Sequence, residues 1–98
     1  MNYDGDMEFE WDQSKAAINL TKHGISFEQA QTVFDNPLAF IFEDEAHSIS
    51  EHREIIIGHS ERNRLLLISF TERPSAIRII SARLATRKER EDYEQNTF

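Results

Sequence analysis

The sequence contains no cysteine, which excludes a disulfide framework, a thiolate zinc site and a cysteine nucleophile. It also lacks any apolar run close to the ~20 residues that a membrane-spanning helix needs. The first six residues are polar and acidic, unlike a secretory signal. A glycine-rich phosphate loop, the H-E-x-x-H motif and the nucleophile elbow are absent too. We therefore expect a cytoplasmic protein that needs no cofactor and does not enter a membrane.

Positive charge is scarce in the first half of the chain. The 98 residues carry a formal net charge of −7, but the two halves differ. Residues 1–51 hold two basic side chains against eleven acidic ones, whereas residues 52–90 hold nine basic against four acidic. The arginine-rich half can present a phosphate-binding surface although the whole chain is acidic. An equally simple interpretation is that these arginines only keep the exposed sides of strands in solution.

The length suits a single domain, which we assign to residues 7–98, with a disordered tail at residues 1–6. We predict one helix over residues 12–23 and a second over residues 26–35, because each range begins with a capping side chain and carries apolar residues at helical spacing. Thr86 opens a final helix in the same way.

The middle of the chain has the period-two pattern of β-strands. Predicted strands cover residues 38–42, 54–58, 65–71 and 77–83, with a short additional strand around Phe9. Short polar stretches between them favour hairpins. We therefore predict an α+β fold, with an antiparallel sheet of four to five strands, the two N-terminal helices on one face and a C-terminal helix docked through Tyr93.

Two arginines in the last strand are the main candidates for chemistry. Arg78 stands between two isoleucines, so its side chain must emerge on the opposite face of the strand. There it could act on a ligand, pair with a carboxylate such as Glu54 or Glu72, or face water. Arg83 lies an odd number of residues further on, so the two share a face only if the strand bends, bulges or ends early.

A metal site is a weaker possibility. His47 and His52 lie near three acidic residues, Glu43, Asp44 and Glu45, and such groups can bind a divalent cation. Loop residues of this kind are more often simply solvated. We therefore expect no metal.

Several short sequence motifs, taken in their order along the chain, resemble those of a known family. They are Met7-Glu8-Phe9-Glu10-Trp11-Asp12, Lys15, Asn19, Lys22-His23-Gly24-Ile25-Ser26-Phe27-Glu28, Phe34-Asp35-Asn36-Pro37-Leu38, Arg53 with Ile55-Ile56-Ile57-Gly58, Leu65-Leu66, Thr71-Glu72-Arg73, the run 77–83 and Ala85-Thr86-Arg87-Lys88-Glu89. Together they resemble the BrnT toxins over about residues 7–94.

The resemblance implies a ribonuclease toxin of a type II toxin–antitoxin system with a RelE-like fold. It also implies an adjacently encoded ribbon-helix-helix antitoxin of the BrnA type and an RNA substrate. Operator DNA would be contacted only through the toxin–antitoxin complex, which represses its own promoter.

RNA cleavage without a metal uses the 2′-OH of the substrate as the nucleophile. The protein must accept that proton, stabilise the phosphoryl oxygens and protonate the leaving oxygen. We assign Arg78 and Arg83 to the phosphate, Glu72 to the base, and His23 or His59 to the acid. A salt bridge of Glu72 to Arg73 or Arg64, and a helix-capping role for His23, are competing interpretations.

Other cations of the basic half, Arg53, Arg73, Arg87 and Lys88, are predicted to bind RNA. The alternative to an enzyme is a binding module that docks its basic face onto an acidic partner or nucleic acid.

Overall fold

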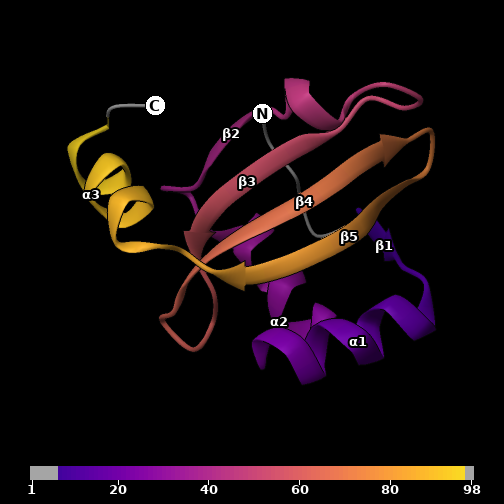
Figure 1. The fold of residues 1–98 in the computed structure, drawn as a ribbon, viewed down its shortest axis with the longest axis horizontal. Helices are drawn as coiled ribbons and strands as arrows, with labels where there is room; N and C mark the ends of the chain where they lie inside the picture. The colour runs from indigo at the N-terminus through magenta and orange to yellow at the C-terminus, as the bar shows by residue number, and fades with distance from the viewer. Residues whose placement is uncertain (1–6, 97–98) are drawn as a thin grey trace.

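The computed structural model describes residues 7–96, which are organised around one five-stranded sheet (Figure 1). The elements in chain order are β1 (Glu8–Glu10), α1 (Gln13–His23), α2 (Phe27–Gln31), the 3-10 helix η1 (Thr32–Asp35), β2 (Phe40–Glu43), the 3-10 helix η2 (Glu45–His47), β3 (Glu54–His59), β4 (Leu65–Arg73), β5 (Ala76–Leu84) and α3 (Arg87–Gln95). The predicted α+β class is confirmed. The tail predicted at residues 1–6 lies outside the described residues, as do residues 97 and 98.

The strands are ordered β1-β5-β4-β3-β2, and the chain from β2 to β5 forms the predicted antiparallel meander. The prediction of a wholly antiparallel sheet is wrong, because β1 pairs with β5 in the parallel sense. Consecutive strands joined by tight turns must run antiparallel. No such turn connects β1 to its partner, which follows dozens of residues later in the chain, so its direction is not set by a hairpin.

The second predicted helix is shorter than expected. The α-helical part ends at Gln31, and the chain continues as a 3-10 turn from Thr32 to Asp35. The hydroxyl of Thr32 donates to the carbonyl oxygen of Gln29 at 2.7 Å, and such local side-chain bonds compete with regular helix bonds.

Helix ends follow the sequence closely. The Asp12 carboxylate accepts from the backbone N–H of Lys15 at 3.0 Å, and Gly24 ends α1 in the left-handed conformation with φ 69°. At α3, Thr86 and Glu89 form the predicted reciprocal capping box. These caps explain why α1 begins and ends, and why α3 begins, where the sequence places them.

One face of the sheet carries the hydrophobic core. Buried side chains from β3, β4 and β5 pack there against residues of α2 and η1, including Phe27, Val33 and Phe34. Phe34 contacts Phe70 of β4 edge to face, with ring centroids 5.0 Å apart. We call this the core face. No helix within residues 7–96 has the length and apolar composition that a membrane crossing requires.

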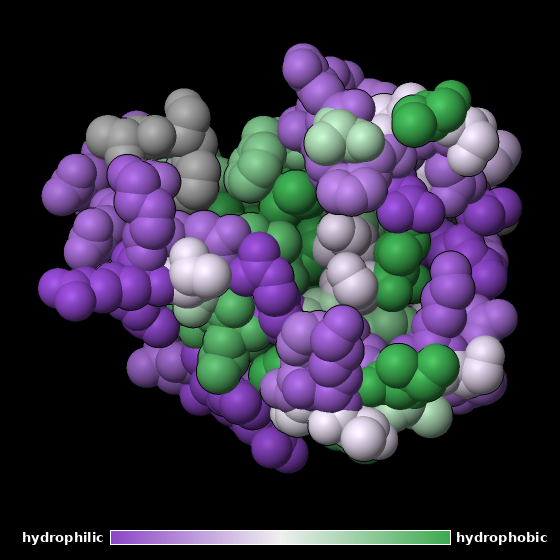
Figure 2. Space-filling view, in the orientation of Figure 1, coloured by the Kyte–Doolittle hydropathy of each residue, from purple (hydrophilic) through white to green (hydrophobic). Residues whose placement is uncertain are grey.

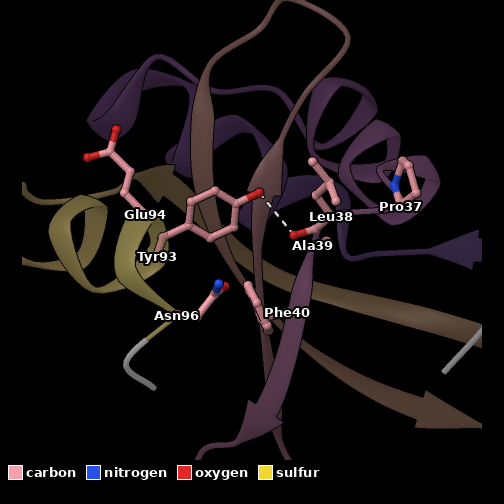
Figure 3. Close-up of a pocket in the computed structure, with 7 residues that line it drawn as sticks. All are labelled: Pro37, Leu38, Ala39, Phe40, Tyr93, Glu94 and Asn96. Atoms are coloured by element: carbon pink, nitrogen blue, oxygen red, sulfur yellow. Dashed lines mark hydrogen bonds between the residues drawn. The ribbon is translucent and has the colours of Figure 1, made fainter.

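Helix α3 docks at the end of the sheet through Tyr93, as predicted. The Tyr93 hydroxyl donates to the carbonyl oxygen of Leu38 at 3.0 Å (Figure 3). Its ring lies edge to face on Phe40 and on His59, with centroid distances of 5.8 and 5.6 Å. A hollow of about 350 Å³ remains beside this contact. Its lining is mainly apolar, so it offers little for acid–base chemistry.

Candidate functional site

A β-bulge decides where the two candidate arginines lie. In the pairing of β4 with β5, Ser69 lies opposite Ser81 and Phe70 opposite Ile79, which leaves Ile80 as the extra residue. Beyond the bulge the alternation of side chains is shifted by one. Without it, Arg78 and Arg83 would point to opposite faces of the sheet.

The bulge therefore places both arginines on one face. Arg78 lies opposite Thr71, and Arg83 lies opposite Leu67. These partners are four residues apart on a regular strand, so they share a face and lie about 13 Å from each other. We call the side of the sheet that bears Arg78, Ser81 and Arg83 the arginine face. It is the side opposite the core face.

Arg78 is held by a carboxylate from the N-terminal strand. Its Nη1 donates to Oε2 of Glu10 at 2.8 Å, and both side chains are partly exposed, 31% and 42%. Glu10 lies directly beside Arg78 in the parallel pairing of β1 with β5. The partners suggested by the sequence, Glu54 and Glu72, are not the ones found here. A single hydrogen bond at one nitrogen leaves the rest of the guanidinium fork open to a phosphate.

Arg83 is bound more firmly, by Glu89 at the start of α3. Two of its nitrogens donate to the two carboxylate oxygens at 2.8 and 2.9 Å. The same carboxylate accepts from the backbone N–H of Thr86 at 2.8 Å. The bond from Arg83 is the main reason that the pKa of Glu89 falls from 4.5 to about 2. Arg83 thus joins α3 to the end of β5.

The proposed base and acid lie away from these arginines. Glu72 follows Thr71 on β4, so its side chain belongs to the core face rather than to the arginine face. His23 is the last residue of α1 and is half-buried beside β5. His59, the alternative acid, packs against Tyr93. The four residues assigned to catalysis are therefore not assembled in one cluster.

The structure adds one carboxyl group that the sequence did not single out as an acid or base. Glu54 is 8% exposed. Burial, followed by repulsion from Glu72, raises its pKa. A carboxyl group with a raised pKa retains its proton to higher pH, as a general acid must. The sequence shows only a glutamate at the start of a strand, so no local pattern reveals its burial.

Three of the four residues predicted to bind RNA form ion pairs within the chain. Arg73 approaches Glu51 at 3.6 Å. On α3, Arg87 and Lys88 pair with the acidic residues one helical turn later, at 3.4 and 2.8 Å. Arg53 is half-buried, and its Nε atom has no hydrogen-bond partner among the described residues. Exposed pairs of this kind are weak, so a phosphate can displace them.

The acidic loop does not form a metal centre in the part of the chain that is described. His47 contacts Asp44 at 2.9 Å, and His52 contacts Glu43 at 3.4 Å. Within residues 7–96, no three metal-ligating side chains converge.

The surface also carries an apolar hollow. On the side shown in Figure 2, apolar side chains fill a strip at the middle of the face, and hydrophilic side chains flank it. Such a strip between charged margins is typical of a surface that takes part in binding.

The chain is similar to a known protein family and to a solved structure. The family described as the ribonuclease toxin BrnT of type II toxin–antitoxin systems matches residues 11–89. A similar solved structure is the 1.1 Å crystal structure of the ribonuclease toxin BrnT from Brucella abortus, with 25% sequence identity and a TM-score of 0.64. The similarity covers 83% of this chain and 99% of that one. No curated protein sequence matches the chain. The family match includes α1, the whole sheet from β2 to β5 and the bulge.

Proposed function

Because this chain belongs to the BrnT family of type II toxin–antitoxin ribonuclease toxins, we propose that it is a metal-independent endoribonuclease that arrests growth in the cytoplasm until an antitoxin neutralises it. The 2′-OH of the RNA attacks the adjacent phosphate, so the nucleophile comes from the substrate. The observation that carries this proposal is the bulge at Ile80, which gives Arg78 and Arg83 a common face.

Arg78 binds the phosphate that is cleaved. Its contact with Glu10 uses one nitrogen and is partly exposed, so the remaining donors can engage the phosphoryl oxygens. Arg83 lies about 13 Å further along the sheet, where Glu89 holds its guanidinium group at the start of α3. Arg83 binds a second phosphate of the same RNA strand. This phosphate either displaces the carboxylate of Glu89 or accepts hydrogen bonds from the exposed edge of the Arg83 guanidinium group.

Proton transfer requires a base and an acid that the bound RNA can reach. Glu72 as the base and His23 as the acid both require RNA to reach around the sheet from the arginine face. Glu54, with its raised pKa, is a further candidate acid beside Glu72. Glutamine variants of the three residues distinguish these roles, because loss of a general acid or base typically lowers the rate about 10²–10⁴-fold.

The fold and the partner follow from the same family. We propose a RelE-like arrangement, with the N-terminal helices across one face of the sheet, and an adjacently encoded ribbon-helix-helix antitoxin of the BrnA type. Such an antitoxin covers the arginine face, and within the toxin–antitoxin complex it is the antitoxin that contacts operator DNA. In the complex, Arg78 and Arg83 should lose solvent exposure.

The experiment compares three reactions of the purified chain with the reactions of two variants. RNA should be cut with and without excess EDTA, whereas an all-deoxy oligonucleotide of the same sequence should not be cut. Arg78→Ala should lose RNA cleavage, and Arg62→Ala, in the turn between β3 and β4, should retain it. Complete loss of activity with EDTA, or equal cleavage of DNA, would contradict the mechanism. RNA binding without cleavage would favour the binding module.

A further inference from the structure

Helix α1 lies beside a part of β5 that none of the described strands covers. The parallel strand β1 pairs with β5 from Ala76 to Arg78, and beyond that point no other strand within residues 7–96 pairs with the outer edge of β5. The side chain of Asn19, on α1, takes over this edge. Its amide donates to the carbonyl oxygen of Ala82 at 2.8 Å, and its oxygen accepts from the N–H of Ala82 at 3.0 Å. A third bond, to the carbonyl oxygen of Ile25, fixes the side chain at 2.9 Å.

A shallow cavity of about 190 Å³ lies along this seam between α1 and β5. Lys15, Lys22 and His23 line it from the helix, and Ser81 lines it from the strand. Lys15 and Lys22 are seven residues apart, so they lie on one side of the helix with a rise of about 10.5 Å between them. None of the described residues that line the cavity is acidic.

Both lysines are free to bind an anion. They are the two basic side chains of residues 1–51, and neither forms an ion pair among the described residues. Asp12, the acidic residue nearest in sequence, is engaged in capping α1. By contrast, Arg78 and Arg83 on the arginine face are already paired with Glu10 and Glu89. An anion at the lysine cavity therefore meets less competition from the chain itself than an anion on the arginine face.

The cavity is continuous with the arginine face. Ser81 lies opposite Ser69 on β4, between the positions that oppose Arg78 and Arg83, so its side chain belongs to the arginine face. It also lines the lysine cavity. A chain of phosphates that passes Arg78 can thus turn over the edge of β5 at Ser81 and reach the lysines on α1.

We propose that Lys15 and Lys22 bind the phosphodiester backbone of single-stranded RNA next to the arginine face. This inference rests on the proposed function, because RNA is the substrate considered there. Lysine ammonium groups bind phosphate as point charges without reading the base. His23 supplies the only ring in the described cavity lining, and stacking of a base on such a ring does not depend on the sequence. The site therefore adds affinity without sequence preference.

The test measures RNA binding separately from cleavage. The probe is a single-stranded 2′-O-methyl RNA oligonucleotide, whose blocked 2′ position cannot act as the nucleophile, and binding is followed by fluorescence anisotropy at 50–200 mM salt. For single strands, the slope of log K against log salt is about −0.7 for each phosphate contact. The slope for the double variant K15Q/K22Q should therefore be less negative than that of the wild type by about 1.4. The ratio of wild-type affinity to variant affinity should therefore fall about sevenfold as the salt concentration rises from 50 to 200 mM.

Two further variants control the measurement. R62Q/R90Q removes the same charge from two exposed arginines that form no ion pair within residues 7–96, and it should keep the wild-type slope. K15R/K22R keeps the charge at the cavity and should also bind as the wild type does. An unchanged slope in K15Q/K22Q, or an equal loss in R62Q/R90Q, would refute the site.

Failure of the proposed function looks different. A wild-type chain that never cuts unmodified RNA, but whose binding slope still falls in K15Q/K22Q, would refute the ribonuclease and keep the lysine site. Cleavage of unmodified RNA by the wild type, together with an unchanged binding slope in K15Q/K22Q, would support the ribonuclease and refute the lysine site.

Discussion

Replacing Glu89 by glutamine tests how firmly Arg83 joins α3 to the sheet. The carboxylate of Glu89 accepts two bonds from Arg83, at 2.8 and 2.9 Å, and one from the backbone of Thr86, at 2.8 Å. Glutamine keeps the size and one acceptor oxygen but loses the charge. The variant should weaken the docking of α3 and release the guanidinium group of Arg83.

The size of the effect follows from the pKa of this carboxyl group. A pKa that falls from 4.5 in the unfolded chain to about 2 in the folded one corresponds to roughly 3 kcal/mol of stability at neutral pH. The side chain of Arg83 is 37% exposed, so solvent screens the pair, and we expect about 1–2 kcal/mol. Because the folded pKa of Glu89 is lowered, this stability is present above about pH 4.5. It is lost as the pH falls towards 2.

Urea unfolding of the wild type and of Glu89→Gln over a range of pH provides the assay. The difference in unfolding free energy should be constant from neutral pH down to about pH 5 and should shrink below pH 4.5. Glu91→Gln is the matched control, because Glu91 contacts Arg87 at 3.4 Å on the exposed surface of α3. A difference for Glu89→Gln that does not vary with pH would refute the reasoning, since it would then come from lost packing and not from charge.

Substitutions at three other positions test the remaining parts of the structure. Arg78→Ala should lower the rate of RNA cleavage about 10²–10³-fold in a single-turnover assay, and Arg78→Lys should also be slow, because a point charge cannot replace the guanidinium fork. The melting temperature of Arg78→Ala should stay close to that of Arg62→Ala; a large drop in melting temperature would mean that Arg78 is structural. Asn19→Ala leaves the edge of β5 without its buried partners, so urea unfolding should show a loss of about 2–4 kcal/mol, and a loss below about 1 kcal/mol would mean that water replaces them. Gly58→Ala places a Cβ atom 2.7 Å from the Cβ of Ala39, so it should destabilise the chain by about 1–3 kcal/mol by the same measure, whereas an unchanged stability would show that β2 can move aside.

The sequence predicted the parts of the fold that depend on neighbours in the chain. The cap at Asp12, the left-handed Gly24 and the capping box of Thr86 and Glu89 each arise from residues within a few positions of one another. The antiparallel meander follows from short connections in the same way. Local patterns of this kind are visible without coordinates.

Features that depend on distant residues were not predictable. The parallel pairing of β1 and the bond between Glu10 and Arg78 join residues 68 positions apart. The sequence showed that Arg78 and Arg83 needed an irregularity to share a face, but nothing in the run of apolar residues marks Ile80 as the extra one. The burial of Glu54 likewise depends on what packs over the start of β3.

The bulge has a consequence for comparing this chain with its relatives. A relative whose last strand is regular would need one residue fewer between its two arginines to keep them on the same side. An alignment without gaps would then pair Arg83 with a residue that points into the relative's hydrophobic interior. The site would look lost in that relative although its geometry is intact. Alignments across this strand should therefore permit a single-residue gap at Ile80, and the two arginines should be compared by the strand position that each one opposes.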